Sequence, residues 1–577
     1  MLLLWFLWPF VVNGDRFPLG PDAPVYLWWT RLAGVDGLSA VDRPGVPALA
    51  LVLQGTLGLS VVQATAAIEV VLGAGVGLAS AALVRRSTSA WDAALAGLLA
   101  GTFAVHLSAG YVATLTMAAA LLAAGTLLDD PRLRAAVLAA LVLGGGGLAH
   151  PDFLWLSAAI LLVAAATAWR SERTEAFRLA GAAVGGGALL ALGLLAVRPG
   201  APRLDVDTSK DAFLRRAGLG AELRSEYRDR FVHRWTRYVE WVSVPLAIAG
   251  FGGGQGNPGR ILRAWFVVTF VGVVVAFVTG WLPADRFITF GFAVPILAAL
   301  GLMWVWRRLG ERRLLAYGVI GVLTFLMVAG SGIAWNRQDP FMSDEQVVAV
   351  SIANDAISTS VKPGTPLAFW VNEPDEAISF SATRAGNVIR AGVPPDRIRD
   401  VVIVVPPLPG GAESPQRRAL ERLSADDLRA AESRTGRSAK VFVLRPFDET
   451  DSPKGAIVVD PPVIDVRPVD PLEPASAGAV VWASIATLAL LSVVGFGWAR
   501  IGLEDPVRAA AVSPAVGAAA VILVAVGFDA IGISLGSTGS AIAASAIAGG
   551  GGYLVGFVLK RRTRTHPAPQ VEQQPAE

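Results

Sequence analysis

Long apolar runs constrain this chain more than any other feature of its sequence. Stretches of roughly 18 to 24 mostly apolar residues recur along it, and a helix of about 20 such residues crosses the hydrocarbon core of a bilayer. Of its 577 residues only 16% are charged and 54% are hydrophobic, with a mean hydropathy of +0.54. A soluble domain has about 25% charged residues. The sequence therefore predicts a polytopic α-helical membrane protein.

We expect about fourteen transmembrane helices. Basic residues follow the even-numbered ones, as Arg85 and Arg86 or Arg307 and Arg308 do. By the positive-inside rule, this pattern predicts a multi-pass protein of the inner (cytoplasmic) membrane with both termini in the cytoplasm. The expected spans are 1–12, 62–84, 91–107, 110–128, 133–149, 153–169, 179–197, 237–253, 264–282, 287–306, 314–335, 478–499, 509–531 and 538–559.

Residues 336–477 are less apolar and alternate between two kinds of pattern. Short β-rich runs at 366–371, 401–405, 440–444 and 456–459 are separated by helical stretches. This alternation predicts a small extracytoplasmic α/β domain with a parallel sheet, inserted before the last three membrane helices. No Gly-rich phosphate loop follows any of these runs, so we expect no nucleotide site there.

These patterns divide the chain into four parts. We expect a transmembrane module at 1–335 with outer loops at 13–61 and 198–236, the α/β domain at 336–477, three C-terminal membrane helices at 478–562, and a disordered cytoplasmic tail at 563–577. The outer loop 198–236 is strongly basic. It could be an amphipathic helix lying on the membrane, or an electropositive surface for an anionic ligand.

The segment that follows the first span carries the most informative polar residue. Asp22 precedes Ala23-Pro24 and an aromatic run. Its carboxylate could cap a helix that begins with Pro in its first turn, or it could face a polar cavity; the two roles can coexist.

Three of the four histidines fall on the predicted outer side. His106, His150 and His233 are candidates because polar groups at the mouth of a helix bundle are costly unless they face protein or water. A hydrogen bond to a neighbouring carbonyl is the alternative for each. No His pair has the i, i+4 spacing of helical zinc ligands, and the chain has no Cys for disulfides or thiolate chemistry.

Taken together, these features resemble the GT-C superfamily of integral-membrane glycosyltransferases. The resemblance is to bacterial members related to dolichyl- and polyprenyl-phosphate-sugar-dependent mannosyl- and arabinosyltransferases. It rests on Asp22 within GPDAPVYLWWTRL, a helix expected at about 46–59, HLSAGYVATLTMAAALL (106–122), LAHPDFLWLSAAILL (148–162), and PADRF (283–287). Many members have paired acids in the first outer loop. Here Asp15, Asp152 or Asp285 would have to supply the second one, or it is missing.

The resemblance implies an inverting glycosyltransferase that moves a sugar from a polyprenyl-phosphate-linked donor to an extracytoplasmic glycan, lipid or protein. Asp22 would be the general base, or a ligand of Mg²⁺ or Mn²⁺, a cation that is optional with one clear carboxylate. Arg286 would contact the lipid phosphate, since a guanidinium binds phosphate with two parallel hydrogen bonds. The remaining candidate substrate-binding residues are Tyr26, Arg31, His106, Tyr111, His150, Asp152, His233 and Asp285. We expect no nucleic-acid partner.

Two other functions remain open. A lipid or solute transporter or flippase would use a charged group near the membrane midplane. Glu69 and Asp529 lie inside predicted spans, although a buried structural hydrogen bond fits each of them too, and the two halves of the chain show no internal repeat. A non-catalytic GT-C-like scaffold would explain the missing second acid. Convergence of Asp22, Arg286 and the histidines on one outer cavity would favour the glycosyltransferase.

Overall fold

The structure is a computed structural model of the chain. It describes residues 1–20, 22–103, 112–197, 218, 220–238, 241–280, 282–310, 312–336, 361–362, 365–371, 401–405, 425–426, 428–433, 435–444, 457–459 and 472–565.

The described chain is mostly helical, and eight of its helices are long and apolar enough to cross a membrane. They are α4 (Val61–Val84), α9 (Pro151–Ala168), α10 (Arg173–Ala196), α14 (Gly256–Thr279), α17 (Arg313–Asn336), α21 (Ala477–Gly502), α22 (Pro506–Ala530) and α23 (Thr538–Thr565). The shorter apolar helices are α1 (Leu2–Trp8) with the π-turn η1 (Pro9–Asn13), α3 (Gly45–Leu57), α7 (Val112–Leu127) and α8 (Leu133–Ala149). The chain is thus a membrane protein by its helices, and the count of fourteen spans stays a prediction.

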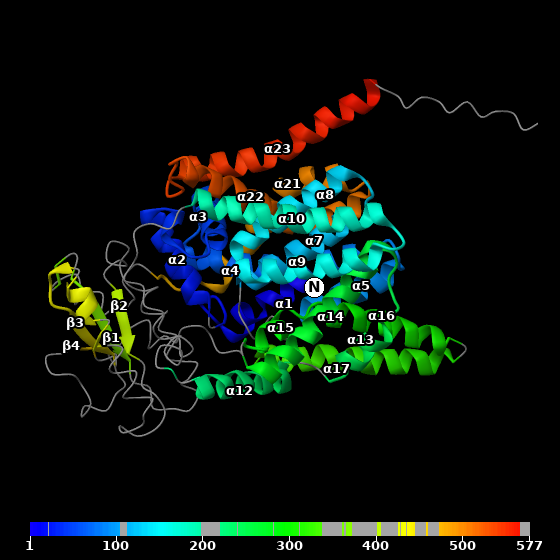
Figure 1. The fold of residues 1–577 in the computed structure, drawn as a ribbon, viewed down its shortest axis with the longest axis horizontal. Helices are drawn as coiled ribbons and strands as arrows, with labels where there is room; N and C mark the ends of the chain where they lie inside the picture. The colour runs from blue at the N-terminus through cyan, green and yellow to red at the C-terminus, as the bar shows by residue number, and fades with distance from the viewer. Residues whose placement is uncertain are drawn as a thin grey trace, which may run out of the picture.

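Helix α4 forms the centre of the bundle (Figure 1). Its start is fixed by a capping box: Ser60 Oγ accepts the Gln63 N–H at 3.2 Å, and Gln63 Oε1 accepts the Ser60 N–H at 3.0 Å. α4 packs against α1, α5 (Ala90–Thr102), α7, α21 and α22. A helix that is apolar on all faces is expected to be buried on all sides, and nearly all of α4 is buried.

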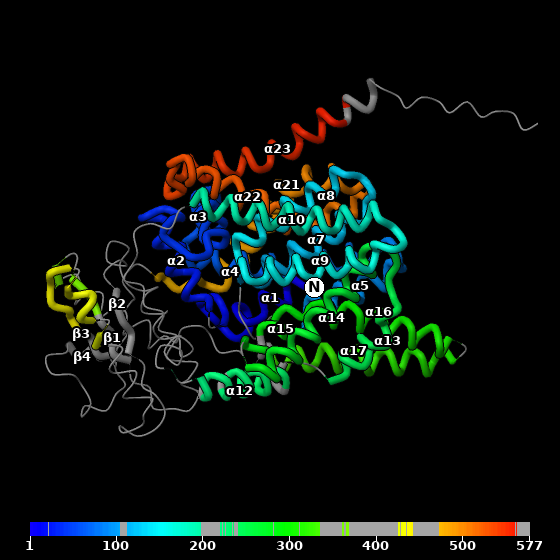
Figure 2. Tube along the Cα trace, viewed as in Figure 1, coloured from blue at the N-terminus to red at the C-terminus, as the bar shows by residue number. Residues whose placement is uncertain are grey.

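The C-terminal helices complete the bundle instead of standing apart from it. α22 packs against α3, α4, α7 and α8, and α23 packs against α3 (Figure 2). Helices from the two ends of the chain therefore share one core, in which Val52, Val71 and Ile522 are fully buried.

The predicted outer loop 13–61 is largely helical. It contains α2 (Ala23–Asp36), the short 3-10 turn η2 (Leu38–Ala40) and the expected helix, which is α3. Both helices are packed into the bundle: Tyr26, Leu32 and Leu49 are each at most 2% exposed. Their apolar faces explain why the segment folds inward.

Two predicted spans are not single helices. The predicted span 237–253 contains the last residues of α12 (Gly220–Tyr238) and the separate, seven-residue helix α13 (Ser243–Ala249). Pro245 is tolerated only in a first helical turn and the glycines at 250 and 252–254 do not favour a helix, so the segment stays short. Span 287–306 is divided into α15 (Asp285–Thr289) and α16 (Ala293–Arg308) by residues 290–292.

The end of the chain also differs from its prediction in part. α23 continues to Thr565, three residues into the predicted tail. Lys560, Arg561 and Arg562 are good helix formers, and their charges suit a helix C-terminus. Residues 566–577 lie outside the described part of the chain.

The four predicted strands form where the sequence placed them. β1 (Leu367–Val371), β2 (Val401–Val405), β3 (Lys440–Leu444) and β4 (Ile457–Val459) make one parallel sheet in the order β2-β1-β3-β4. In Figure 1 the sheet lies beside the helical bundle. Whether 336–477 is an independent extracytoplasmic domain stays a prediction.

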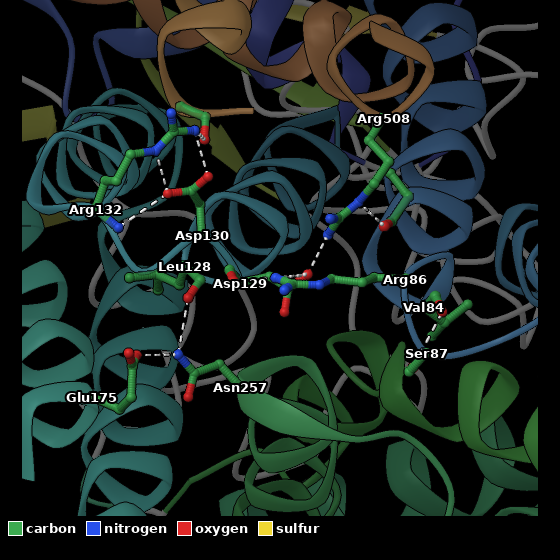
Figure 3. Close-up of polar contacts among 12 residues, drawn as sticks. Val84, Arg86, Ser87, Leu128, Asp129, Asp130, Arg132, Glu175, Asn257 and Arg508 are labelled. Atoms are coloured by element: carbon green, nitrogen blue, oxygen red, sulfur yellow. Dashed lines mark hydrogen bonds and ion pairs between the residues drawn. The ribbon is translucent and has the colours of Figure 1, made fainter. Parts of the chain in front are cut away.

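At one end of the bundle, the turn between α7 and α8 ties several helices together (Figure 3). Arg508 of α22 donates to Asp129 Oδ2 at 2.8 Å and to the Ala82 carbonyl at 3.0 Å. Asn257 of α14 donates to the Leu128 carbonyl at 2.9 Å and to Glu175 of α10 at 2.7 Å. Arg508 thus has protein partners, which indicates a structural role.

Candidate active site

The turn between α8 and α9 contains two of the predicted site residues, His150 and Asp152. His150 ends α8 and precedes α9, with φ −149° and ψ 88°, and Pro151 takes the first helical position. Pro is favoured there because it has no N–H to leave unsatisfied. His150 is only 4% exposed, whereas the Asp152 side chain is 52% exposed. The turn therefore presents a buried imidazole beside a water-facing carboxylate.

Arg43, which the sequence analysis did not select, connects these residues to the first outer loop. Its Nη1 lies 3.2 Å from His150 Nε2 and donates to the Tyr26 hydroxyl at 3.4 Å. Its Nη2 lies 3.5 Å from Asp152 Oδ2. Two residues later, Gly45 packs directly on the end of α8: a Cβ at this position would lie 2.4 Å from the Ala149 nitrogen. The contact between Arg43 and the α8–α9 turn thus depends on a glycine.

Arg286 reaches the same carboxylate from α15. Its Nη1 donates to Asp152 Oδ2 at 3.1 Å, and both side chains are 52% exposed. Two guanidinium groups therefore share one carboxylate oxygen. The two arginines have more N–H groups than this oxygen can accept, so the arrangement can bind a further anion.

An aromatic stack holds α9 against α15. The rings of His150 and Phe153 lie 4.1 Å apart, and Phe153 stacks on Phe290 at 4.7 Å with 10° between the planes. Trp265 of α14 lies 5.2 Å from Phe290 and donates its indole N–H to the Phe290 carbonyl at 2.7 Å. Because Phe290 follows α15 directly, the stack brings Arg286 beside Asp152.

His150 is held in its neutral form. Burial lowers its pKa well below the usual value, and the positive charges of Arg43 and Arg286 lower it further. A guanidinium can only donate, so Nε2 must accept from Arg43, which leaves the proton on Nδ1. Nδ1 is buried and has no hydrogen-bond partner among the residues the structure describes. An unsatisfied buried donor costs about 1–3 kcal/mol.

Asp22 lies at the N-cap of α2, but its side chain makes no capping hydrogen bond there. Only its carbonyl takes part, accepting the N–H groups of Val25 at 3.0 Å and Tyr26 at 3.3 Å. The capping interpretation of the carboxylate is therefore wrong. Burial disfavours the charge of Arg43, but Tyr26, Asp152 and Asp22 together raise its pKa. Asp22 is thus close enough to Arg43 to act on it electrostatically.

The other predicted site residues differ in how far the structure places them. Arg31 is buried on α2, the helix that carries Tyr26. Asp285 opens α15, but its side chain lies outside the described residues, as do His106 and Tyr111. His233 is exposed on α12, which packs against α15. The structure thus brings Tyr26, His150, Asp152 and Arg286 together around Arg43.

About half of the predicted basic outer loop 198–236 is helix α12, and most of the rest lies outside the described residues. Arg228 of α12 donates to the carbonyls of Phe277 and Val278 at 3.3 and 3.4 Å. These carbonyls belong to the last turn of α14, where a cation is favourable. At least one basic residue of the loop therefore has a helix-capping role.

Glu69 is one of the two acids on which the transporter interpretation depended, and its hydrogen-bond partner is a backbone N–H group. Glu69 lies within α4, is 4% exposed, and accepts the Leu19 N–H at 3.1 Å. Leu19 belongs to the outer segment that leads to Asp22. Glu69 therefore anchors that segment. Asp15, a candidate for the second acid, is buried nearby, since its charge acts on Glu69.

Within the described ranges, no three His, Asp or Glu side chains lie close enough to hold a metal ion together. The optional Mg²⁺ or Mn²⁺ stays a prediction.

Arg43 could have been found from its place in the sequence. The positive-inside rule disfavours Arg in short loops on the outer side, and Arg16, Arg31 and Arg43 all lie in the predicted outer loop 13–61. An arginine kept there against this bias is a candidate for function.

Comparisons with known proteins give only distant similarity. No model of a protein family matches the chain, and no curated protein matches it. Among solved structures, the chain is similar to archaeal oligosaccharyltransferase AglB from Archaeoglobus fulgidus in complex with an inhibitory peptide and a dolichol-phosphate, with 12% identity and a TM-score of 0.43. It is also similar to the Archaeoglobus fulgidus oligosaccharyltransferase in its apo form, with 10% identity and a TM-score of 0.41. Each match covers 70% of this chain and 63% of the other. Similarity at this level assigns no activity to the chain.

Proposed function

We propose that this protein is a membrane glycosyltransferase of the GT-C type, which moves a sugar from a polyprenyl-phosphate-linked donor to an extracytoplasmic glycan, lipid or protein. The observation that carries the proposal is the cluster around Asp152. Arg43 and Arg286 share its carboxylate at 3.5 and 3.1 Å, with neutral His150 beside them.

The cluster suits a phosphate at the membrane surface. A lipid-linked donor cannot leave the bilayer, so its phosphate must be bound where the helices meet water. Arg43 and Arg286 supply permanent positive charge and planar pairs of donors. Asp152 keeps the two guanidinium groups together when no anion is bound.

In the transfer, the acceptor hydroxyl oxygen forms a bond to the anomeric carbon. The bond from that carbon to the donor phosphate oxygen breaks, and its electron pair leaves with the polyprenyl phosphate. Asp22 is the proposed base that takes the hydroxyl proton. Arg43 and Arg286 stabilise the negative charge that develops on the leaving phosphate.

Binding of a polyprenyl monophosphate to the protein in lipid nanodiscs tests the proposal. Arg43→Gln and Arg286→Gln should each weaken binding, because each removes a charged donor pair from the phosphate. Arg85→Gln is the matched control: Arg85 is an exposed arginine whose Nη1 donates to the Thr88 carbonyl, and this change should leave binding unaltered. Equal binding by all three variants and the parent would overturn the proposed function.

Transfer of a radiolabelled sugar from the same lipid to membrane acceptors is the second measurement. A protein that binds the lipid phosphate and transfers no sugar under any donor tested would be a scaffold or a flippase. Movement of a fluorescent lipid analogue between leaflets separates those two outcomes.

A further inference from the structure

Asp529, near the end of α22, is the second acid within a predicted span. Its Oδ1 accepts the Leu38 N–H at 3.0 Å. Leu38 opens η2, the turn that leads to Arg43 five residues later. A C-terminal membrane helix therefore contacts the segment that carries the central arginine of the candidate site.

The backbone at this contact is shaped to fit the carboxylate. Gly37 ends α2 with φ +80°, a conformation that L side chains rarely adopt. A Cβ on Gly37 would lie 3.0 Å from Asp529 Oδ1. Close approach of the acid thus needs both the φ value and the absent side chain.

The other end of the same segment is also held by the C-terminal helices. Thr56 Oγ1 lies 3.0 Å from Ser545 Oγ of α23. A Cβ on Gly55 would lie 2.4 Å from the Ala541 Cβ. Contacts with α22 and α23 therefore fix residues 37–56 before and after Arg43, while Gly45 sets their distance from the α8–α9 turn.

We propose that Asp529 is a positioning residue for Arg43: by holding the Leu38 N–H, it sets where the Arg43 guanidinium meets His150 and Asp152. The inference rests on the proposed function of the cluster. It gives α22 and α23 a part in donor binding.

The test measures polyprenyl monophosphate binding in nanodiscs for Asp529→Leu and Asp529→Asn. Leu removes the acceptor, so the loop shifts and polyprenyl monophosphate binding should weaken. Asn keeps an acceptor oxygen at the same distance, so it should restore most of the binding. Asp529→Glu, which keeps the charge and moves the acceptor by one methylene, should bind weakly and serves if the Leu variant does not fold.

Asp505→Leu is the matched control. Asp505 Oδ1 accepts the Val507 N–H at 2.8 Å at the other end of the same helix. This variant should lower the melting temperature and leave lipid binding unchanged. If any weakening of α22 reduced lipid binding, Asp505→Leu and Asp529→Leu would both bind weakly. That result would overturn the inference.

Combination with Arg43→Gln decides whether Asp529 acts through Arg43. If it does, Asp529→Leu should cause no further loss in the Arg43→Gln background, whereas independent effects add. Full binding by Asp529→Leu, beside weak binding by Arg43→Gln, would overturn this inference alone. Full binding by both Arg43→Gln and Arg286→Gln would overturn the proposed function as well.

Discussion

Asp22 and Arg43 act on each other across the first outer loop, and their side chains have different tasks. Arg43 keeps its charge despite burial because Tyr26, Asp152 and Asp22 raise its pKa. The Asp22 carboxylate is not used to cap α2. A substitution that keeps the size of Asp22 and removes its charge can therefore test whether the carboxylate acts as a base, without the loss of a helix cap.

Asp22→Asn should leave the melting temperature almost unchanged, because no capping hydrogen bond of the side chain is lost. If the carboxylate is the base, sugar transfer should fall by about 10²–10⁴-fold. The measurement is transfer by purified protein at matched abundance, beside complementation of a deletion strain. Full transfer by Asp22→Asn would remove Asp22 from the catalytic step.

His150 should make the fold sensitive to acid. In the folded protein its pKa is lowered by burial and by Arg43 and Arg286, with Asp152 as the nearby opposing charge. The unfolded chain binds a proton near pH 6.5, which the folded chain resists. Its contribution to stability is therefore complete above about pH 6.5 and is lost as the pH falls below it, by up to about 1.4 kcal/mol per pH unit.

His150→Gln should remove that sensitivity. Thermal unfolding in detergent, compared between about pH 7.5 and pH 5.5, should show a smaller loss of melting temperature for the variant than for the parent. Other acid-sensitive groups are common to both proteins and cancel in the comparison. An equal loss in the two proteins would mean that His150 is protonated in the folded state.

Among the elements, α3 and the α8–α9 turn make the contact on which the site depends most closely. Gly45→Ala would place a Cβ 2.4 Å from the Ala149 nitrogen, so the two elements must separate. Overpacking of this kind typically costs about 1–3 kcal/mol, and here it also moves Arg43 away from His150. We expect lower stability together with weaker polyprenyl phosphate binding.

Gly75→Ala is the control for that change. Gly75 lies within α4, and nothing is within 4 Å of its Cβ position. Alanine is the better helix former by about 1 kcal/mol, so this variant should be as stable as the parent or more so. Unaltered lipid binding by Gly45→Ala would mean that the α3 contact does not position Arg43.

Sequence patterns identified the elements better than their contacts. Apolar length predicted α4, α9 and α22 within three residues, and short β-rich runs predicted all four strands, because both signals are local in the sequence. The packing of α2 and α3 into the bundle was not predicted, since it depends on contacts with helices far away in the sequence. Arg43 was missed because its partners Tyr26, His150 and Asp152 are brought to it only by packing.

For the whole molecule, the polar residues gather at opposite ends of the helices. α9 begins beside His150 and ends near Glu172, which pairs with Arg260 at 2.8 Å. In α22, Arg508 lies in the first turn and Asp529 in the last turn. The candidate site and the network around Asp129 are therefore separated by the length of the bundle, and changes at one end should be tested for effects at the other.

The Arg508–Asp129 pair should contribute to stability without affecting lipid binding. Its side chains are 9% and 10% exposed, and removing one partner of a buried pair costs about 3–5 kcal/mol. Arg508→Gln should lower the melting temperature strongly, and adding Asp129→Asn should recover part of the loss, because no buried charge then lacks its partner. Thermal unfolding and lipid binding on the same samples check both statements. Loss of lipid affinity in the folded variant would mean that the two ends are coupled.

The direction of the bundle in the membrane decides whether Arg43 faces a lipid-linked donor outside the cytoplasm. α22 offers a direct test, because Glu504 precedes it, Ser534 follows it, and both are exposed. The chain has no Cys, so single cysteines at these positions are the only ones in this protein that a membrane-impermeant maleimide can label.

The positive-inside rule places Arg500 and Arg508 in the cytoplasm. Ser534→Cys should therefore be labelled in intact cells and Glu504→Cys only after permeabilisation. Labelling of both in intact cells would mean that α22 does not span the membrane. The reverse pattern would place Arg43, His150 and Asp152 in the cytoplasm, and it would contradict an extracytoplasmic acceptor.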